Sequence, residues 1–369
     1  MDLVASLPAK VPFEPPLPAN TTPRDLPKAT HYPSLDGLRG LAACMVVYGH
    51  AGYFCWVPLL SGCATIGVLL FFFLSGFLMG DHYLPAPSSG LFNRSILNYW
   101  AAFLLRRFLR VYPPYFFAPI LGYLLLMPLM PPDFEVARPF QSLSVVHELA
   151  NIAAFKGPQG IYWTIQVELF FYMLYPFIIT LCLLFRNAAG ALFLVFCALT
   201  LSRYLVPLGQ WPGFTAIFVA GVFTAVMAKK TGGVLDGRLL GWHGLSAFSF
   251  LVLILIVALV SHLSATQMSI WRFDGLFAVL FFVMFISLIR SGGAIGRMLS
   301  TKVCAALGRA SYSLYLVHII AFYIVVTYVE QAYRGKVMAV VVLIILTSLY
   351  HVFVEKPFVR LSKRIVVNK

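Results

Sequence analysis

The segment ATIGVLLFFFLSGFLMG at residues 64–80 carries no charged side chain. As a helix, this run is long enough to cross the hydrocarbon core of a bilayer, which is about 30 Å thick. Comparable apolar runs lie at 38–57, 108–130, 164–185, 188–206, 212–228, 243–262, 274–290, 304–327 and 337–355. The sequence therefore predicts an all-α fold, a polytopic membrane helical bundle of about ten transmembrane helices.

The composition agrees with a membrane protein and excludes a soluble one. Of the 369 residues, 60% are hydrophobic and 11% are charged, whereas about a quarter of the residues are charged in a typical soluble domain. The mean hydropathy is +0.87. These values also exclude a collagenous chain and an intrinsically disordered one.

The excess of positive charge is explained by membrane topology and needs no nucleic-acid partner. The net charge is +14, from 27 Lys and Arg residues against 13 Asp and Glu residues. With a cytoplasmic N-terminus, 21 of those 27 basic residues fall on the inner side of the ten predicted spans, and 6 fall on the outer side. Because basic residues are enriched in cytoplasmic loops, we expect both termini in the cytoplasm and a multi-pass protein of the cell membrane.

The chain divides into a membrane domain and two tails. Residues 1–33 are rich in proline and contain no long apolar run, so we expect a flexible cytoplasmic tail and not a cleaved leader. Residues 34–358 form the predicted membrane domain, and residues 359–369 form a short basic cytoplasmic tail. We therefore expect the membrane bundle itself to perform any chemistry.

Ionisable side chains inside the spans are the first candidates for function, because such groups are costly in a membrane. Arg39 and His50 lie eleven positions apart, about three helical turns, and therefore share one helix face. Span lengths place His50 and Glu168 at the same depth below the outer boundary. A carboxylate beside an imidazole suits a general base, so we predict that these two side chains form a catalytic pair. The alternative is that both are structural.

Three other features have both a functional and a structural interpretation. Arg107 and Arg110 share a helix face and suit phosphate, but arginines at the end of a span are also expected from topology. His318 follows Tyr312 and Tyr315 at three-residue steps, a stripe that could be plain packing. Ser75 could be a nucleophile, although it lacks the Gly-x-Ser-x-Gly frame, and its surroundings read mainly as a small-residue helix contact.

The cysteines do not predict a metal site. All but one or two of the six lie inside predicted spans, with no Cys-x-x-Cys motif and no Cys/His spacing typical of metal ligands. We therefore expect no metal. Cys55 and Cys63 flank the first outer loop and could form a disulfide in an oxidising compartment.

The sequence resembles the membrane acyltransferase 3 family, bacterial integral-membrane enzymes that O-acylate carbohydrates. The resemblance extends from Leu35 to Leu361. Six blocks carry it, in the family's order: LDGLRGLA at 35–42 followed by Gly49-His50, FFFLSGF at 71–77, RFLRVYP at 107–113, WTIQVELFFY at 163–172, SYSLYLVH at 311–318 and VEKP at 354–357.

The resemblance implies acetyl-CoA or another acyl-CoA as co-substrate, with Arg39, Arg107 and Arg110 at its phosphates. It implies His50 and Glu168 as the catalytic pair. The supporting candidates are Asp36, Ser75, Tyr315 and His318. This sequence departs from the family pattern where Thr164 replaces a serine and where Leu169 replaces a second acidic residue found in many members.

We therefore expect an O-acyltransferase that moves an acetyl or other short acyl group to a hydroxyl of a carbohydrate or lipid-linked glycan, most simply in a bacterial inner membrane. Direct transfer and a covalent acyl-enzyme both remain open. Some members of the family carry a fused periplasmic domain. Because this sequence shows none, we expect direct transfer to the acceptor and not relay through an attached domain. The rival hypotheses are a proton-coupled transporter or flippase, which would also need intramembrane His and Glu, and an inactive scaffold.

Overall fold

The computed structural model describes residues 32–53, 61–84, 94–126, 161–185, 187–205, 211–230, 247–256, 273–291, 293–328 and 333–365. Nearly all of these residues are helical, and no strand occurs among them. The predicted all-α class is therefore confirmed. The predicted N-terminal tail, apart from its last two residues, lies outside the described residues, as does Cys55.

A helix lies on each of the ten apolar runs. The helices are α1 (Pro33–Tyr53), α2 (Ser61–His82), α3 (Arg94–Leu126), α6 (Trp163–Leu183), α7 (Ala188–Leu205), α8 (Trp211–Lys230), a short helix at Ala247–Ile256, α10 (Asp274–Ser291), α12 (Lys302–Tyr328) and α13 (Tyr333–Tyr350). Three further elements are α11 (Ala294–Leu299), the π-helical turn η4 (His351–Glu355) and α14 (Lys356–Arg364).

Five of the described helical segments are long and apolar enough to cross a membrane. They are Gly62–His82, Trp163–Leu183, Pro212–Lys229, Lys302–Val326 and Gly335–Arg364. In the last of these only 17% of the most apolar window is buried inside the protein. A helix that leaves so much apolar surface outside requires hydrocarbon as its solvent. The total of about ten spans and the cytoplasmic placement of both termini remain predictions.

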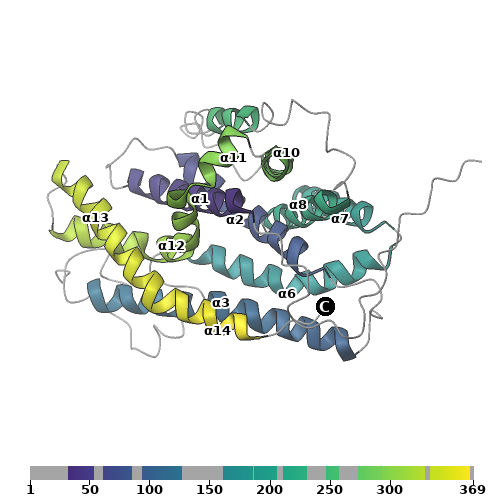
Figure 1. Cartoon of the computed structure of the whole chain (residues 1–369), viewed down its shortest axis with the longest axis horizontal. Helices are drawn as coiled ribbons and strands as arrows, with labels where there is room; N and C mark the ends of the chain where they lie inside the picture. The colour runs from purple at the N-terminus through teal and green to yellow at the C-terminus, as the bar shows by residue number, and fades with distance from the viewer. Residues whose placement is uncertain are drawn as a thin grey trace, which may run out of the picture. The chain divides into compact units, whose positions relative to one another are not determined.

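The packing centre consists of α2 between α1 and α8, with α12 on the other side of α1 (Figure 1). Helices α2 and α8 approach closely because each contributes a glycine to the crossing. A methyl group on Gly76 would overlap the carbonyl oxygen of Phe218, and one on Gly221 would overlap that of Phe73. The small-residue contact predicted for the 71–77 block is thus confirmed, and it follows the usual rule for close helix pairs in membranes.

Helix α3 begins before the predicted span at 108–130 and contains prolines in its interior. It begins at Arg94, where Ile96, Tyr99 and Phe103 make a buried stripe at helical spacing in a segment too polar to be found by hydropathy. It then continues past Pro113 and Pro114. Tyrosine hydroxyls of neighbouring helices donate to carbonyl oxygens of this stretch, at 2.8 Å in the case of Tyr312 and Val111. These bonds tie α12 and α13 to this stretch of α3.

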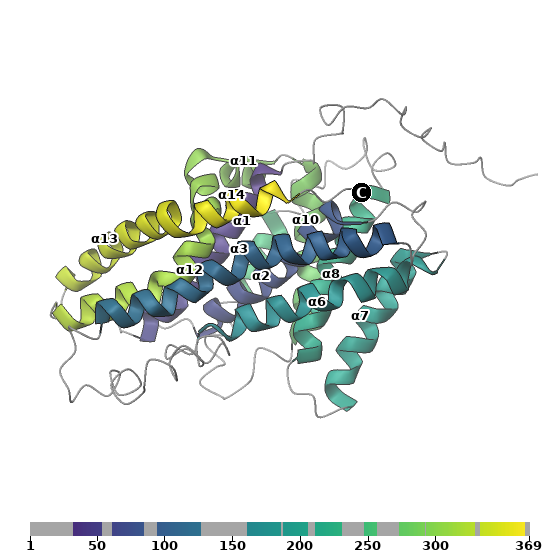
Figure 2. The ribbon, with the colours of Figure 1, turned by 90° about the horizontal axis from the view of Figure 1, so that it is seen from below.

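The C-terminal helices form one continuous rod that runs beside α3. Helix α13, the turn η4 and α14 follow one another without a break, and α14 packs along α3 (Figures 1 and 2). Residues 359–364, expected in the basic tail, are the last part of α14. The π-helical turn adds a residue to one turn of the rod, a distortion that is frequent at functional sites. It buries Glu355 toward α12.

Candidate functional site

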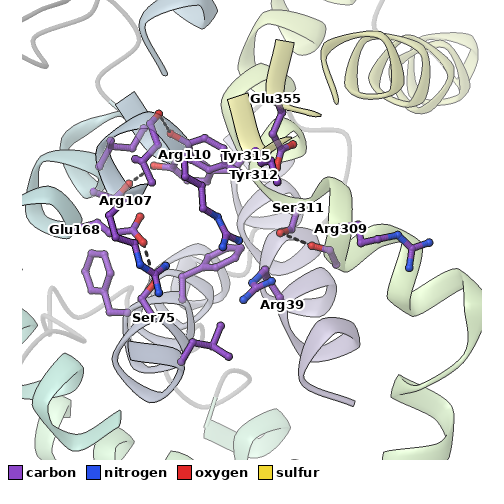
Figure 3. A pocket seen from close by; sticks show the side chains of 18 of the residues that line it. Arg39, Ser75, Arg107, Arg110, Glu168, Arg309, Ser311, Tyr312, Tyr315 and Glu355 are labelled. Atoms are coloured by element: carbon purple, nitrogen blue, oxygen red, sulfur yellow. Dashed lines mark hydrogen bonds between the residues drawn. The ribbon is translucent and has the colours of Figure 1, made fainter. Parts of the chain in front are cut away.

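A cavity of about 350 Å³ lies among α1, α2, α3, α6, α12, η4 and α14 (Figure 3). Among the described residues that line it are six Lys or Arg side chains and two Glu side chains. The basic residues are Arg39, Arg107, Arg110, Arg309, Lys356 and Lys363. This excess of positive charge favours an anionic ligand.

Three arginines bring their charges together although they come from two helices. Arg39 interacts electrostatically with Arg107 and Arg110, and both of those interactions are repulsive. Figure 3 shows the guanidinium groups of Arg39 and Arg110 turned toward each other, whereas Arg309 points away. Asp36 accompanies Arg39 from one turn earlier on α1, with 3.6 Å between carboxylate and guanidinium. A set of mutually repelling guanidinium groups in one cavity is stabilised by an anion that bridges them.

Arg107 is the most deeply placed of these side chains. It is 7% exposed, and its guanidinium carbon stands 5.0 Å from the ring centre of Tyr83, 5.4 Å from that of Tyr172 and 6.0 Å from that of Phe103. These aromatic faces stabilise the cation. Its Nε atom is nevertheless buried without a hydrogen-bond partner. A buried donor without a partner is costly, so a ligand with acceptor oxygens would fit here.

Glu168 faces the same cavity from α6. Its Oε1 atom accepts a hydrogen bond of 2.8 Å from Ser75 Oγ on α2 and another from the hydroxyl of Tyr172. Electrostatic attraction links it to Arg39 and Arg107. Glu168 therefore organises hydroxyl groups and offsets part of the arginine charge.

A second carboxylate of the cavity, Glu355, belongs to the VEKP block at 354–357, which was given no role in the site. It is 6% exposed and accepts hydrogen bonds from Ser313 N at 3.2 Å, from Ser313 Oγ and from His351 Nδ1 at 2.8 Å. The family pattern led us to count one carboxylate, because Leu169 replaces an acidic residue. The VEKP block supplies the second one, and the π-helical turn that buries it has no signature in the sequence.

The structure gives His50 and Glu168 different partners, and their predicted role as a catalytic pair stays a prediction. His50 Nδ1 lies 2.9 Å from Nε2 of His318, and the two rings stack with their centres 5.0 Å apart. Helices α1 and α12 pack closely along their length, which brings these two histidines together. Glu168 instead faces α2 and α3. Equal depth in a bilayer does not fix the lateral position of a side chain.

Tyr315 connects the histidine pair with the cavity. It lines the cavity, and its ring centre is 5.9 Å from that of His318 and 6.4 Å from that of Phe71. Its hydroxyl donates to the carbonyl oxygen of Ile161 and bonds Thr164 Oγ1. Thr164, which replaces the family's serine, thus keeps the hydroxyl function. The histidine pair therefore lies behind Tyr315, which forms part of the cavity wall.

The remaining expectations concern metals and cysteines. Among the described residues, no three His, Cys, Asp or Glu side chains gather in a way that could hold a metal ion, and the absence of a metal stays a prediction. Cys63 is a free, buried thiol. Because Cys55 lies outside the described residues, the disulfide also stays a prediction.

Comparisons with known proteins connect this site with group transfer. A family model described as "Acyltransferase domain" matches residues 32–353. The chain is similar to "Nodulation protein 10" of Rhizobium leguminosarum bv. viciae, with 26% identity over 253 residues, 58% of this chain and 64% of the relative. It is also similar to "Putative peptidoglycan O-acetyltransferase YrhL" of Bacillus subtilis (strain 168), with 25% identity over 376 aligned residues, 92% of this chain and 57% of the relative.

These matches cover only part of the relatives. The chain spans 64% and 57% of the length of the two curated relatives that it matches. No solved structure matches the chain.

Proposed function

We propose that this chain, which belongs to the family with the acyltransferase domain, transfers an acetyl or other short acyl group from acyl-CoA to a carbohydrate hydroxyl. The observation that carries the proposal is the cavity with three converging arginines, one of them buried with an unpartnered Nε atom. A nucleotide-linked thioester has phosphates for such guanidinium groups and a narrow arm that can extend between helices.

In this proposal the donor enters from the cytoplasmic end of the cavity. Lys356 and Lys363 of α14 are exposed at the cavity and add positive charge there. Such charges attract a polyanion and speed its entry. The phosphates then bind Arg39, Arg107 and Arg110, and the thioester arm extends toward Tyr315 and the histidine pair. The charge asymmetry supports a topology with about ten spans and both termini in the cytoplasm.

The reaction that we propose uses His50 as general base. Its imidazole takes the proton of the acceptor hydroxyl, the oxygen attacks the thioester carbonyl, the C–S bond breaks, and the CoA thiolate leaves and takes up a proton. Glu168 does not pair with the base. Its proposed role is to hold Ser75 and Tyr172 by hydrogen bonds and to keep Arg39 and Arg107 in place electrostatically.

A covalent route through Ser75 is the second form of this mechanism. Ser75 lines the cavity and donates to Glu168, so an acyl group could rest on its oxygen before transfer. Ser75→Ala separates the two routes, because direct transfer survives the loss of this hydroxyl and the covalent route does not.

The acceptor is proposed from the relatives. One is named as a putative peptidoglycan O-acetyltransferase, which supports a carbohydrate or lipid-linked glycan of the cell envelope and a place in a bacterial inner membrane. The hydroxyl would reach the histidine pair from the outer side of the bilayer, where the predicted topology puts His50.

A turnover experiment tests the proposal. The purified protein in liposomes is incubated with radiolabelled acetyl-CoA and with envelope glycan fractions, and both free CoA and labelled glycan are measured. We expect release by the wild type, loss of release in His50→Ala, and wild-type release in the control His82→Ala, a histidine that does not line the cavity. A transporter, a flippase or an inactive scaffold would leave acetyl-CoA intact in all three samples.

A further inference from the structure

The two stacked histidines determine which nitrogen of His50 can act as a base. His318 is fully buried, packed between the rings of His50, Tyr315 and Phe322. Its Nδ1 atom is 2.7 Å from the carbonyl oxygen of Tyr315. A carbonyl oxygen can only accept a hydrogen bond, so Nδ1 of His318 carries the hydrogen.

A neutral histidine has one ring hydrogen, and a second one on His318 would create a buried charge in an apolar surrounding, which is costly. Nε2 of His318 therefore carries no hydrogen and presents a lone pair. The 2.9 Å contact between this atom and His50 Nδ1 requires the hydrogen to be on His50, since two lone pairs would repel each other.

We propose that His318 is a positioning residue that holds His50 in the tautomer protonated on Nδ1, so that Nε2 of His50 is the atom that takes the hydroxyl proton. The inference rests on the proposed function. It assigns a positioning role to His318 and a reacting nitrogen to His50, which the sequence motifs do not. When the hydroxyl proton moves to Nε2 and the oxygen forms its bond to the acyl carbon, the imidazolium still donates from Nδ1 to His318. That bond is then charge-assisted and stronger.

Two substitutions of His318 separate this role from packing. In His318→Gln the amide oxygen can reach the place of the ring's Nε2 and accept from His50. In His318→Asn the shorter side chain can replace only Nδ1 and keep the bond to the carbonyl of Tyr315. We expect His318→Asn to lower kcat about 10- to 100-fold, a part of the contribution of a general base, with an unchanged KM for acetyl-CoA. We expect His318→Gln to stay within about threefold of the wild-type kcat.

Equal losses in the two variants, or wild-type kcat in His318→Asn, would overturn the positioning role. Nitrogen NMR on the wild-type protein with labelled histidine gives a readout that depends neither on turnover nor on the variants. The His50 signals, assigned by their loss in His50→Gln, should show the hydrogen on Nδ1, and a hydrogen on Nε2 would contradict the inference. A wild-type protein that does not turn over acetyl-CoA would refute the proposed function, while the NMR result would still decide the tautomer.

Discussion

Replacing Arg107 by methionine tests the anion site at its most buried point. Methionine keeps much of the packing against the rings of Tyr83 and Tyr172 but removes the charge and the donors. A buried cation is costly, and the cation–π contacts of Arg107 together with its attraction to Glu168 offset part of that cost. We therefore expect the free energy of unfolding without ligand to change by no more than about 1 kcal/mol. The free energy of CoA binding should change by more than this free energy of unfolding.

The size of the binding effect follows from the burial of Arg107. A hydrogen bond to a charged group is worth about 1.5–3 kcal/mol, and about 1.4 kcal/mol is a factor of ten. Arg107→Met should therefore raise the Kd for CoA about 10- to 150-fold. At a CoA concentration about 100 times the wild-type Kd, ligand binding stabilises the wild type by about 2.7 kcal/mol, and it should stabilise the variant by only about 0.3–1.4 kcal/mol.

Thermal unfolding in detergent, with and without CoA, measures both quantities. Arg106→Met is the matched control, because Arg106 is the neighbouring residue and carries the same charge but does not line the cavity. The control should keep the full stabilisation by CoA. Equal stabilisation in Arg107→Met and the wild type would refute the phosphate site, whatever the variant's stability without ligand.

Three further outcomes are expected. Gly308→Ala should lower the free energy of unfolding by about 1–3 kcal/mol, because its methyl group would overlap the carbonyl oxygen of Asp36. The control Gly296→Ala places its methyl group where nothing lies within 4 Å, and it should leave the free energy of chemical unfolding unchanged. Equal effects of the two substitutions would contradict the packing. Lys229→Met removes the ammonium group 3.3 Å from the buried Asp81 carboxylate and should lower the free energy of unfolding by about 1–3 kcal/mol. An unchanged free energy of unfolding by pulse proteolysis would show that the ion pair does not stabilise the fold. Glu168→Gln removes the charge that is proposed to keep Arg39 and Arg107 in place, so it should lower acetyl-CoA turnover and weaken CoA binding about tenfold, which is about 1.4 kcal/mol. Unchanged CoA binding by calorimetry would argue against that role.

Apolar runs were sufficient to predict the helices, because a bilayer allows few other structures to cross it. They missed the first part of α3, where Arg106 and Arg107 lower the hydropathy although Ile96 and Tyr99 are buried.

The candidate residues were found from the cost of placing charge in a membrane, but their pairing was not. Arg39, Arg107 and Glu168 face one cavity, as expected for functional side chains. Depth along the bilayer normal could not show that His50 meets His318, because the order of helices around the bundle is a long-range property. The position of Glu355 in the cavity was not predicted, because its burial depends on a local π-helical turn.

The most direct test of the account is a structure of the protein with bound CoA, determined by electron cryomicroscopy in lipid. The account predicts the pyrophosphate within hydrogen-bond distance of Arg107, between Arg39 and Arg110, with the thiol end directed toward Tyr315 and the two histidines. CoA bound outside this cavity, or bound within it with the thiol end away from His50, would contradict the account.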